Sequence, residues 1–349
     1  MKVRWFHRRG AKPDTRGRVW SPGRIVVCGL ALMGGLLVSA QAQIKKDISF
    51  GVPLYERIEK TGVEAQPELH LILRLPKGHS VETPTAKGVL AFCTWQGEAD
   101  SLRSRLASDE DGLVAYAEKH QLALLTWNTA TLWTRGKSYD QVNRRTLQGQ
   151  DNAFDKMARV WRVGVGKICR EFALPEDGFL LYGFSRGAPW GGRLALRLPD
   201  KFLAVYIHVA NSYDKPSGSA AEPLWLVSSG DLDRGRDNAI AFYQECREKG
   251  FPMMLKVQNG LGHAESNESA KLRTAFFDYA MKIRDEAKQS GRTPAEVVLE
   301  ALKTSDLTGD LLSQEVVRSE ETEKIPEIQR VKLPDEEFAK AWGFLREKK

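Results

Sequence analysis

Cysteine is scarce in this sequence, with four residues in a chain of 349. One of them, Cys28, lies in an apolar N-terminal segment, which leaves Cys93, Cys169 and Cys246 for the rest of the chain. Three cysteines form at most one disulfide bond, so a disulfide framework does not hold the fold together. A large hydrophobic core must do so instead, and a chain of this length can bury one.

Several motifs that would point to a cofactor are missing. The sequence has no H-E-x-x-H segment and no paired C-x-x-C segments, so it offers no ligand set for a metal ion. It has no G-x-x-x-x-G-K-S/T loop, and Gly164-Val165-Gly166 lacks the third glycine and the preceding strand of a dinucleotide-binding fingerprint. No metal and no organic cofactor is therefore expected.

Net charge is absent once the N-terminus is set aside. Of the 52 basic and 45 acidic side chains, residues 1–42 hold eight basic and one acidic, and the remaining 307 residues carry 44 of each sign. A neutral body exerts no long-range attraction on a phosphate backbone. Nucleic acid is therefore not an expected partner.

Long hydrophobic runs are rare, and the longest lies near the N-terminus. Ile25–Ala40 contains no charged residue, follows a basic stretch and precedes the small-residue site Ala40-Gln41-Ala42. These three regions in this order are typical of a secretory signal peptide, and the run is shorter than the roughly 20 residues that span a bilayer. We expect cleavage near Ala42, a secreted or periplasmic protein, and no stable membrane insertion after cleavage. An uncleaved anchor is the alternative.

Short apolar segments alternate with amphipathic ones from about Leu69 to Ala280. The apolar runs are typical of strands buried on both faces, and the segments with apolar residues three and four apart are typical of helices. This alternation predicts an α/β fold, with a mostly parallel central sheet and helices on both faces. The predicted strands are His70–Leu75, Gly88–Trp95, Leu122–Trp127, Phe179–Gly183, Phe202–Ala210, Pro223–Ser228 and Met253–Val257, and the predicted helices are Gly112–His120, Asp151–Phe172, Ala188–Leu198, Asn238–Lys249 and Ala270–Glu286.

The character of the chain changes after the last of these helices. Residues 304–333 are polar and charged, with no clear period. A short amphipathic helix follows Pro334, with Phe338, Trp342 and Leu345 on one face. This helix is expected to dock on the main domain, and a separate partner-binding helix is the alternative. The predicted organisation is a signal peptide (1–42), a catalytic α/β domain (43–290) and a polar C-terminal extension (291–349).

The sharpest local signal is Gly183-Phe184-Ser185-Arg186-Gly187, a G-x-S-x-G pattern. The bare pattern is weak, but here it directly follows an apolar strand and opens a helix. A serine on such a sharp strand-to-helix turn is held in a strained conformation, with its hydroxyl lifted from the sheet edge. This context predicts that Ser185 is a nucleophile, with the amides of the helix N-terminus near a developing oxyanion.

A serine hydroxyl is too weakly acidic to attack alone, so this prediction requires a base and an orienting carboxylate. His263 lies in a glycine-flanked loop after a predicted strand and is the candidate general base. His208 lies inside an apolar strand and is expected to be a core residue with its polar atoms satisfied. Asp233 is the expected acid, Asp231 in the same turn is the alternative, and Asp214 is a further one.

The order serine, aspartate, histidine, each after a different strand, matches the partners of an α/β-hydrolase. The segments GFSRG, GGRLALRLPDKF, SGDLD and GLGH resemble those of secreted esterases of the dienelactone-hydrolase, feruloyl-esterase and polyhydroxybutyrate-depolymerase type. The resemblance spans Leu69 to Ala280. It implies an eight-stranded, mostly parallel sheet, a covalent acyl-enzyme intermediate, and no metal or organic cofactor.

The resemblance also implies an oxyanion hole built from two backbone amides. One is the amide of Arg186, and the other follows the predicted strand Gly88–Trp95. The HG or HGGG segment usual there is absent, and Trp95-Gln96-Gly97 stands in its place. We assign the second donor to the backbone of Gln96, with Trp95 as the alternative.

The sequence contains little information on the substrate, apart from aromatic residues near the expected site. Trp95, Trp127 and Trp190 are predicted to line a cleft suited to a sugar or an aromatic acyl group, and simple packing of the rings is the alternative. The sequence thus predicts a secreted serine hydrolase acting on a carboxylic ester, with a small molecule or a polymer fragment as substrate. A serine peptidase of the same fold and a non-catalytic binding protein are the alternatives. The oligomeric state is not indicated.

Overall fold

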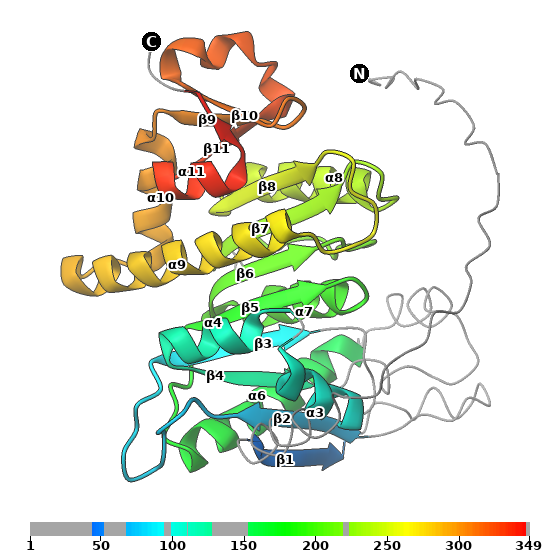
Figure 1. Ribbon diagram of the computed structural model, residues 1–349, viewed down its shortest axis with the longest axis vertical. Coiled ribbons are helices and arrows are strands. Elements are labelled where there is room, and N and C mark those ends of the chain that lie inside the picture. Colours follow the sequence, from blue (N-terminus) through cyan, green and yellow to red (C-terminus); the bar gives the residue numbers. More distant parts are fainter. Residues whose placement is uncertain are drawn as a thin grey trace, which may run out of the picture.

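The computed structural model describes residues 44–51, 68–93, 99–109, 111–127, 153–218 and 223–346. Its main sheet contains the strands β1 (Ile44–Gly51), β2 (Glu68–Arg74), β3 (Gly88–Cys93), β4 (Leu122–Trp127), β5 (Phe179–Phe184), β6 (Phe202–His208), β7 (Leu224–Gly230) and β8 (Met253–Gln258). They are arranged in the order β1-β2-β4-β3-β5-β6-β7-β8 (Figure 1). β2 is antiparallel to both of its neighbours, and every other neighbouring pair is parallel.

Helices cover both faces of this sheet (Figure 1). They are α3 (Ala99–Ser108), α4 (Leu113–His120), α6 (Ala153–Glu171), α7 (Gly187–Arg197), α8 (Arg236–Glu248) and α9 (Asn267–Ser290), with a 3-10 turn at Pro199–Lys201. Successive residues of a strand point to opposite faces. In β5, Tyr182 lies 4.7 Å from the guanidinium of Arg273 in α9, whereas Gly183 lies against Ala188 in α7. α9 and α7 therefore pack on opposite faces, with α4 beside α9 and α6 beside α7.

The predicted α/β fold is confirmed. Each strand and helix expected in the main domain is present. The strands could be predicted because β3 to β8 are buried along almost their whole length. A strand covered on both faces must be apolar at nearly every position. Two elements were not anticipated. β1 is a charged strand at the edge of the sheet, and α3 is polar along much of its length. Within the described ranges no helix is both long and apolar enough to cross a membrane.

The C-terminal extension contains a second sheet, of four short strands. After α10 (Pro294–Thr304) come β9 (Leu307–Asp310), β10 (Glu315–Arg318), β11 (Arg330–Lys332), α11 (Glu336–Trp342) and β12 (Phe344–Leu345), with 3-10 turns at Ser319–Lys324 and Glu327–Gln329. The strand order is β11-β9-β10-β12, and only the β10–β12 pair is parallel. The sequence did not indicate these strands, because two to four residues are too few to display a period.

This second sheet is attached to β8, the last strand of the main sheet. The indole nitrogen of Trp342 donates to the backbone oxygen of Leu255 at 2.7 Å, and only 1% of Trp342 is exposed. Lys256 donates to the backbone oxygen of Trp342, and its Nζ lies 4.4 Å from the centroid of that ring. Gly309 of β9 makes room for the indole, since a β-carbon there would lie 2.4 Å from it. The extension therefore covers the outer edge of β8.

Candidate active site

Ser185 lies in the turn between β5 and α7, at the carboxyl end of the parallel strands. Its φ is 53°, in the left-handed region that residues other than glycine rarely adopt. Its amide donates to the backbone oxygen of His208 at 3.1 Å, and its carbonyl accepts from the amide of Ala188 at 3.0 Å. Gly183 permits this turn, because a β-carbon there would lie 2.9 Å from Ala188 Cα. The strained strand-to-helix turn expected from the sequence is thus present, held by its backbone contacts.

The imidazole of His263 lies between the serine hydroxyl and a carboxylate. Its Nε2 is 2.8 Å from Ser185 Oγ, and its Nδ1 is 3.1 Å from Asp233 Oδ2. The side chain of Asp233 is fully buried, whereas 39% of the His263 side chain is exposed. This arrangement shields the carboxylate from water and leaves the hydroxyl open to a substrate.

Two loops at the ends of neighbouring strands bring Asp233 and His263 together. Gly230, at the end of β7, passes so close to the loop after β8 that a β-carbon would lie 1.9 Å from the backbone oxygen of Leu261. The amide of Leu232 donates to that same oxygen at 3.0 Å. Only glycine tolerates such a close approach, so Gly230 allows the acid-bearing turn to reach the histidine-bearing loop.

Asp233, and not Asp231, contacts the imidazole. The amide of Gly235 donates to Asp233 Oδ1 at 3.0 Å, which leaves Oδ2 for the imidazole. Asp231 lies in the same turn, where its amide and carbonyl hold the backbone in place. Asp214, the further alternative, forms ion pairs with two arginines of α7. The structure therefore brings the first-choice acid to the histidine.

The first expected oxyanion donor lies next to the serine. Arg186 follows it directly and is the N-cap residue of α7, at a helix end whose first amides have no partner within the helix. Arg186 itself is exposed. The second expected donor, Gln96, and its alternative, Trp95, lie outside the described residues.

Two of the tryptophans that were expected to line a substrate cleft are buried. Trp127 is fully buried and packs edge-on against Trp161 of α6, with ring centroids 5.6 Å apart. Trp190 is 6% exposed and belongs to the hydrophobic core. Both residues therefore belong to the packed interior and are not exposed on an open surface. Trp95, the third of this group, lies outside the described residues.

The three cysteines in the described ranges are buried. Cys93, Cys169 and Cys246 are free and buried, and burial raises the pKa of all three thiols. A buried thiol with a raised pKa stays protonated and is a poor nucleophile. Among these residues there is also no cluster of three or more His, Cys, Asp and Glu side chains that could hold a metal ion. Ser185 Oγ, by contrast, lies 2.8 Å from an imidazole nitrogen.

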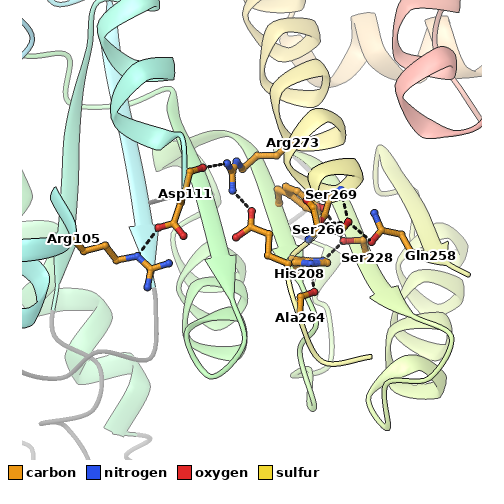
Figure 2. A network of polar contacts seen from close by, with 11 residues as sticks. Arg105, Asp111, His208, Ser228, Gln258, Ala264, Ser266, Ser269 and Arg273 are labelled. Atoms are coloured by element: carbon orange, nitrogen blue, oxygen red, sulfur yellow. Dashed lines mark hydrogen bonds and ion pairs between the residues drawn. The ribbon is translucent and has the colours of Figure 1, made fainter. Parts of the chain in front are cut away.

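The chain directly after His263 is held by buried polar groups (Figure 2). The backbone oxygen of Ala264 accepts from Nε2 of His208 at 3.1 Å. Glu265 forms an ion pair with Arg273 of α9, whose side chain is 5% exposed. The next residue caps α9. Three successive positions after the imidazole are thus fixed to the body of the fold.

The same network extends from α9 to α3. Arg273 also donates to the backbone oxygen of Asp111, and the Asp111 carboxylate accepts from Arg105 of α3 at 2.6 Å (Figure 2). α3 begins just after residues 94–98, where the second oxyanion donor is expected. The network therefore links α3 to the loop that carries the histidine.

Sequence reasoning found part of this support. His208 was expected to be a satisfied core residue, which is confirmed, since it is fully buried and both ring nitrogens have partners. Its contact with the histidine loop was not anticipated, and neither was the buried Arg273. In the sequence, each of the two is an ionisable residue on an otherwise apolar face. Such a residue must have a polar partner when it is buried, but the sequence does not show which group that partner is.

Comparisons with known proteins bear on the fold. No family profile and no curated protein matches the chain. A solved structure assigned as a dipeptidyl aminopeptidase IV from Bacteroides ovatus is similar over 69% of this chain but only 36% of its own length, with a TM-score of 0.50 and 12% identity. A ferulic acid esterase is similar over 69% of this chain and 98% of its own, with a TM-score of 0.45 and 18% identity. An S-formylglutathione hydrolase from Staphylococcus aureus is similar over 67% of this chain and 98% of its own, with a TM-score of 0.44 and 13% identity.

The strand order, the antiparallel end of the sheet and the turn after β5 define the architecture. Eight strands follow the order β1-β2-β4-β3-β5-β6-β7-β8, with β2 reversed. A serine with positive φ joins β5 to the helix behind it. These features, with the likeness to the Bacteroides ovatus structure, identify the α/β-hydrolase fold.

Proposed function

We propose that this protein is a serine hydrolase that cleaves a carboxylic ester, with Ser185 as nucleophile, His263 as general base and Asp233 as the orienting acid. One observation carries the proposal: the continuous chain of contacts from Ser185 Oγ through the imidazole to Asp233, at 2.8 and 3.1 Å. A hydroxyl, an imidazole and a carboxylate in this chain are the groups that acyl transfer requires. The choice of an ester follows the resemblance of the sequence segments around them. The proposed substrate is a small ester or an ester-bearing polymer fragment, and no cofactor takes part.

The proposed reaction begins with the serine hydroxyl. His263 Nε2 takes its proton while Ser185 Oγ attacks the carbonyl carbon of the ester, and Asp233 stabilises the imidazolium that forms. The amide of Arg186 donates to the oxyanion of the tetrahedral intermediate. The imidazolium then protonates the leaving alcohol, and an acyl group remains on the serine. The same imidazole activates a water molecule, which releases the acid and restores the hydroxyl.

A fluorophosphonate probe tests this proposal on the folded protein, because it reacts with a serine that a neighbouring base activates. We expect the wild type to be labelled and Ser185→Ala to remain unlabelled. Ser290→Ala, at the far end of α9, is the matched control and should be labelled like the wild type. Failure of the folded wild type to label would reject the hydrolase and favour a non-catalytic binding protein.

The substrate class is tested by comparing an ester with an amide. We expect turnover of p-nitrophenyl acetate and no comparable turnover of peptide p-nitroanilides. Both reactions pass through an acyl-enzyme, so the same triad serves either. A higher kcat/KM for the amide than for the ester would favour a serine peptidase of the same fold.

We also propose that the protein is exported and that its first 42 residues are removed. The basic stretch, the uncharged run and the site Ala40-Gln41-Ala42 support this proposal. N-terminal sequencing of protein recovered from the periplasm or the medium should give a chain that begins at Gln43. A protein that stays in the cytoplasmic fraction with its original N-terminus would reject it.

A further inference from the structure

His208 contacts both segments of the chain that carry the reacting groups. It is the last residue of β6 and is fully buried. Its backbone oxygen accepts from the amide of Ser185 at 3.1 Å. Its Nε2 lies 3.1 Å from the backbone oxygen of Ala264, the residue that follows His263 (Figure 2). The hydroxyl and the imidazole, which are 2.8 Å apart, are therefore both fixed to this one residue.

The partners of His208 determine which ring nitrogen carries the proton. The carbonyl of Ala264 can only accept a hydrogen bond, so Nε2 must donate. Nδ1 lies 2.7 Å from Ser228 Oγ and therefore accepts from that hydroxyl. Ser228 Oγ is in turn 2.8 Å from the hydroxyl oxygen of Tyr206. A chain of three buried side chains thus ends on the histidine loop.

Burial keeps this ring neutral. It lowers the pKa of His208 to about 4, although the hydrogen bond to Ala264 opposes this shift. The nearby guanidinium of Arg273 acts in the same direction as burial, and the Asp233 carboxylate acts against it. A neutral ring has one donor and one acceptor, and so it binds Ala264 and Ser228 together. A protonated ring would have two donors and would lose the bond from the serine hydroxyl.

We propose that His208 is a positioning residue, which sets the spacing between the hydroxyl of Ser185 and the imidazole of His263. Its backbone holds the first group and its ring holds the loop of the second. The inference rests on the proposed function and adds to it a side chain that touches neither substrate nor a reacting atom. The ion pair of Glu265 with Arg273 holds the next residue, so the loop is fixed at two successive positions after His263.

Three substitutions separate this role from a general contribution to stability. In His208→Asn the amide takes approximately the place of Nδ1, so it contacts Ser228 but does not reach Ala264. In His208→Gln the amide nitrogen takes approximately the place of Nε2 and still donates to Ala264. Ser228→Ala is the matched control, because it removes a buried hydroxyl from the same chain and leaves the bond to Ala264 in place.

We expect His208→Asn to lower kcat for p-nitrophenyl acetate by about 10²-fold with little change in KM, because a misplacement of about 1 Å has an effect of this size. His208→Gln should recover most of kcat. Ser228→Ala should lower Tm but keep most of kcat. A loss of kcat that follows Tm across the three variants, instead of following the presence of the donor to Ala264, would overturn the positioning role.

The ring-proton NMR signals of His263 give a second readout, which does not require turnover. His208→Asn should shift or broaden them, and His208→Gln should leave them close to those of the wild type. Unchanged signals in a folded His208→Asn protein would overturn the inference. If the wild type hydrolyses no ester, the proposed function fails, and this comparison of signals decides the positioning role on its own.

Discussion

Lys256 lies beneath the C-terminal extension, where its charge makes stability depend on pH. Only 5% of the residue is exposed, and its Nζ lies over the ring of Trp342. Burial lowers the pKa of Lys256 from 10.5 to about 8, against an opposing effect of Glu268. Between about pH 8 and pH 10.5 the folded protein therefore binds fewer protons at this group than the unfolded chain does. The contribution of this group to stability must therefore rise with pH through this window, and it is constant below about pH 8, where the group is protonated in both states.

The size of the effect follows from the difference between the two pKa values. One pKa unit corresponds to about 1.4 kcal/mol, so the titration of Lys256 contributes about 3 kcal/mol. In Lys256→Met the titrating group is gone. We expect the free energy of unfolding of the wild type, relative to that of the variant, to rise by about 3 kcal/mol between pH 7 and pH 10.5. Buried tyrosines with raised pKa values lower stability at high pH in both proteins, and the subtraction removes them.

Urea unfolding followed by tryptophan fluorescence, at constant ionic strength and at each pH, measures the two free energies. Lys288→Met, an exposed lysine of α9, controls for the loss of one positive charge. A difference between the wild type and Lys256→Met that changes by less than about 1 kcal/mol over this range would refute the reasoning. It would mean that the ammonium group is not desolvated under the extension.

Three further changes test the site and the attachment of the extension. Asp233→Asn should lower kcat for p-nitrophenyl acetate by about 10⁴-fold, because the imidazole loses the partner that fixes its tautomer. Asp231→Asn should change kcat by less than about 3-fold. Equal losses of kcat in the two variants would contradict the assignment of the acid. Gly183→Ala should lower the free energy of unfolding by about 1–3 kcal/mol, because its β-carbon would lie 2.9 Å from Ala188 Cα, and should slow fluorophosphonate labelling; unchanged labelling would contradict a tight turn. Trp342→Phe should cost about 1–3 kcal/mol in urea unfolding, because a buried carbonyl of β8 loses its donor; an unchanged free energy would show that the indole contact contributes nothing.

The central sheet and the nucleophile turn could be predicted because local sequence determines them. A strand with helices on both faces must be apolar throughout, and Phe202–His208 and Leu224–Gly230 are buried at every position. The turn at Ser185 is preceded by Gly183, where a β-carbon would lie 2.9 Å from Ala188 Cα, so a larger residue does not fit there. Such constraints act on single positions and remain visible in a single sequence.

The choice of acid depended on contacts between distant segments. Asp231 and Asp233 share one turn, and the sequence alone left both open. Two contacts decide between them, the amide of Gly235 on Asp233 Oδ1 and the close approach of Gly230 to the histidine loop. Likewise Trp127 was expected at the cleft, but Trp161 on a separate helix gives its ring a buried partner. The direction of a side chain depends on what packs against it, and periodicity does not reveal that.

The extension was the least predictable part. Its strands are short, and its core depends on contacts with β8. Residues 304–333 are polar and show no period, so the sequence gives no indication of these contacts. Lys256 in the strand and Trp342 in the last helix meet across 86 positions of sequence. Neither residue alone indicates the other.

The position of the extension over β8 has a consequence for solubility. Without it, β8 would be an open edge, and the backbone oxygen of Leu255 would lose the indole that now binds it. An uncovered, apolar edge strand is a template on which another molecule can add its own strand. A chain shortened at residue 290, where the alternating pattern of the main fold ends, is therefore expected to self-associate and precipitate instead of giving a minimal domain.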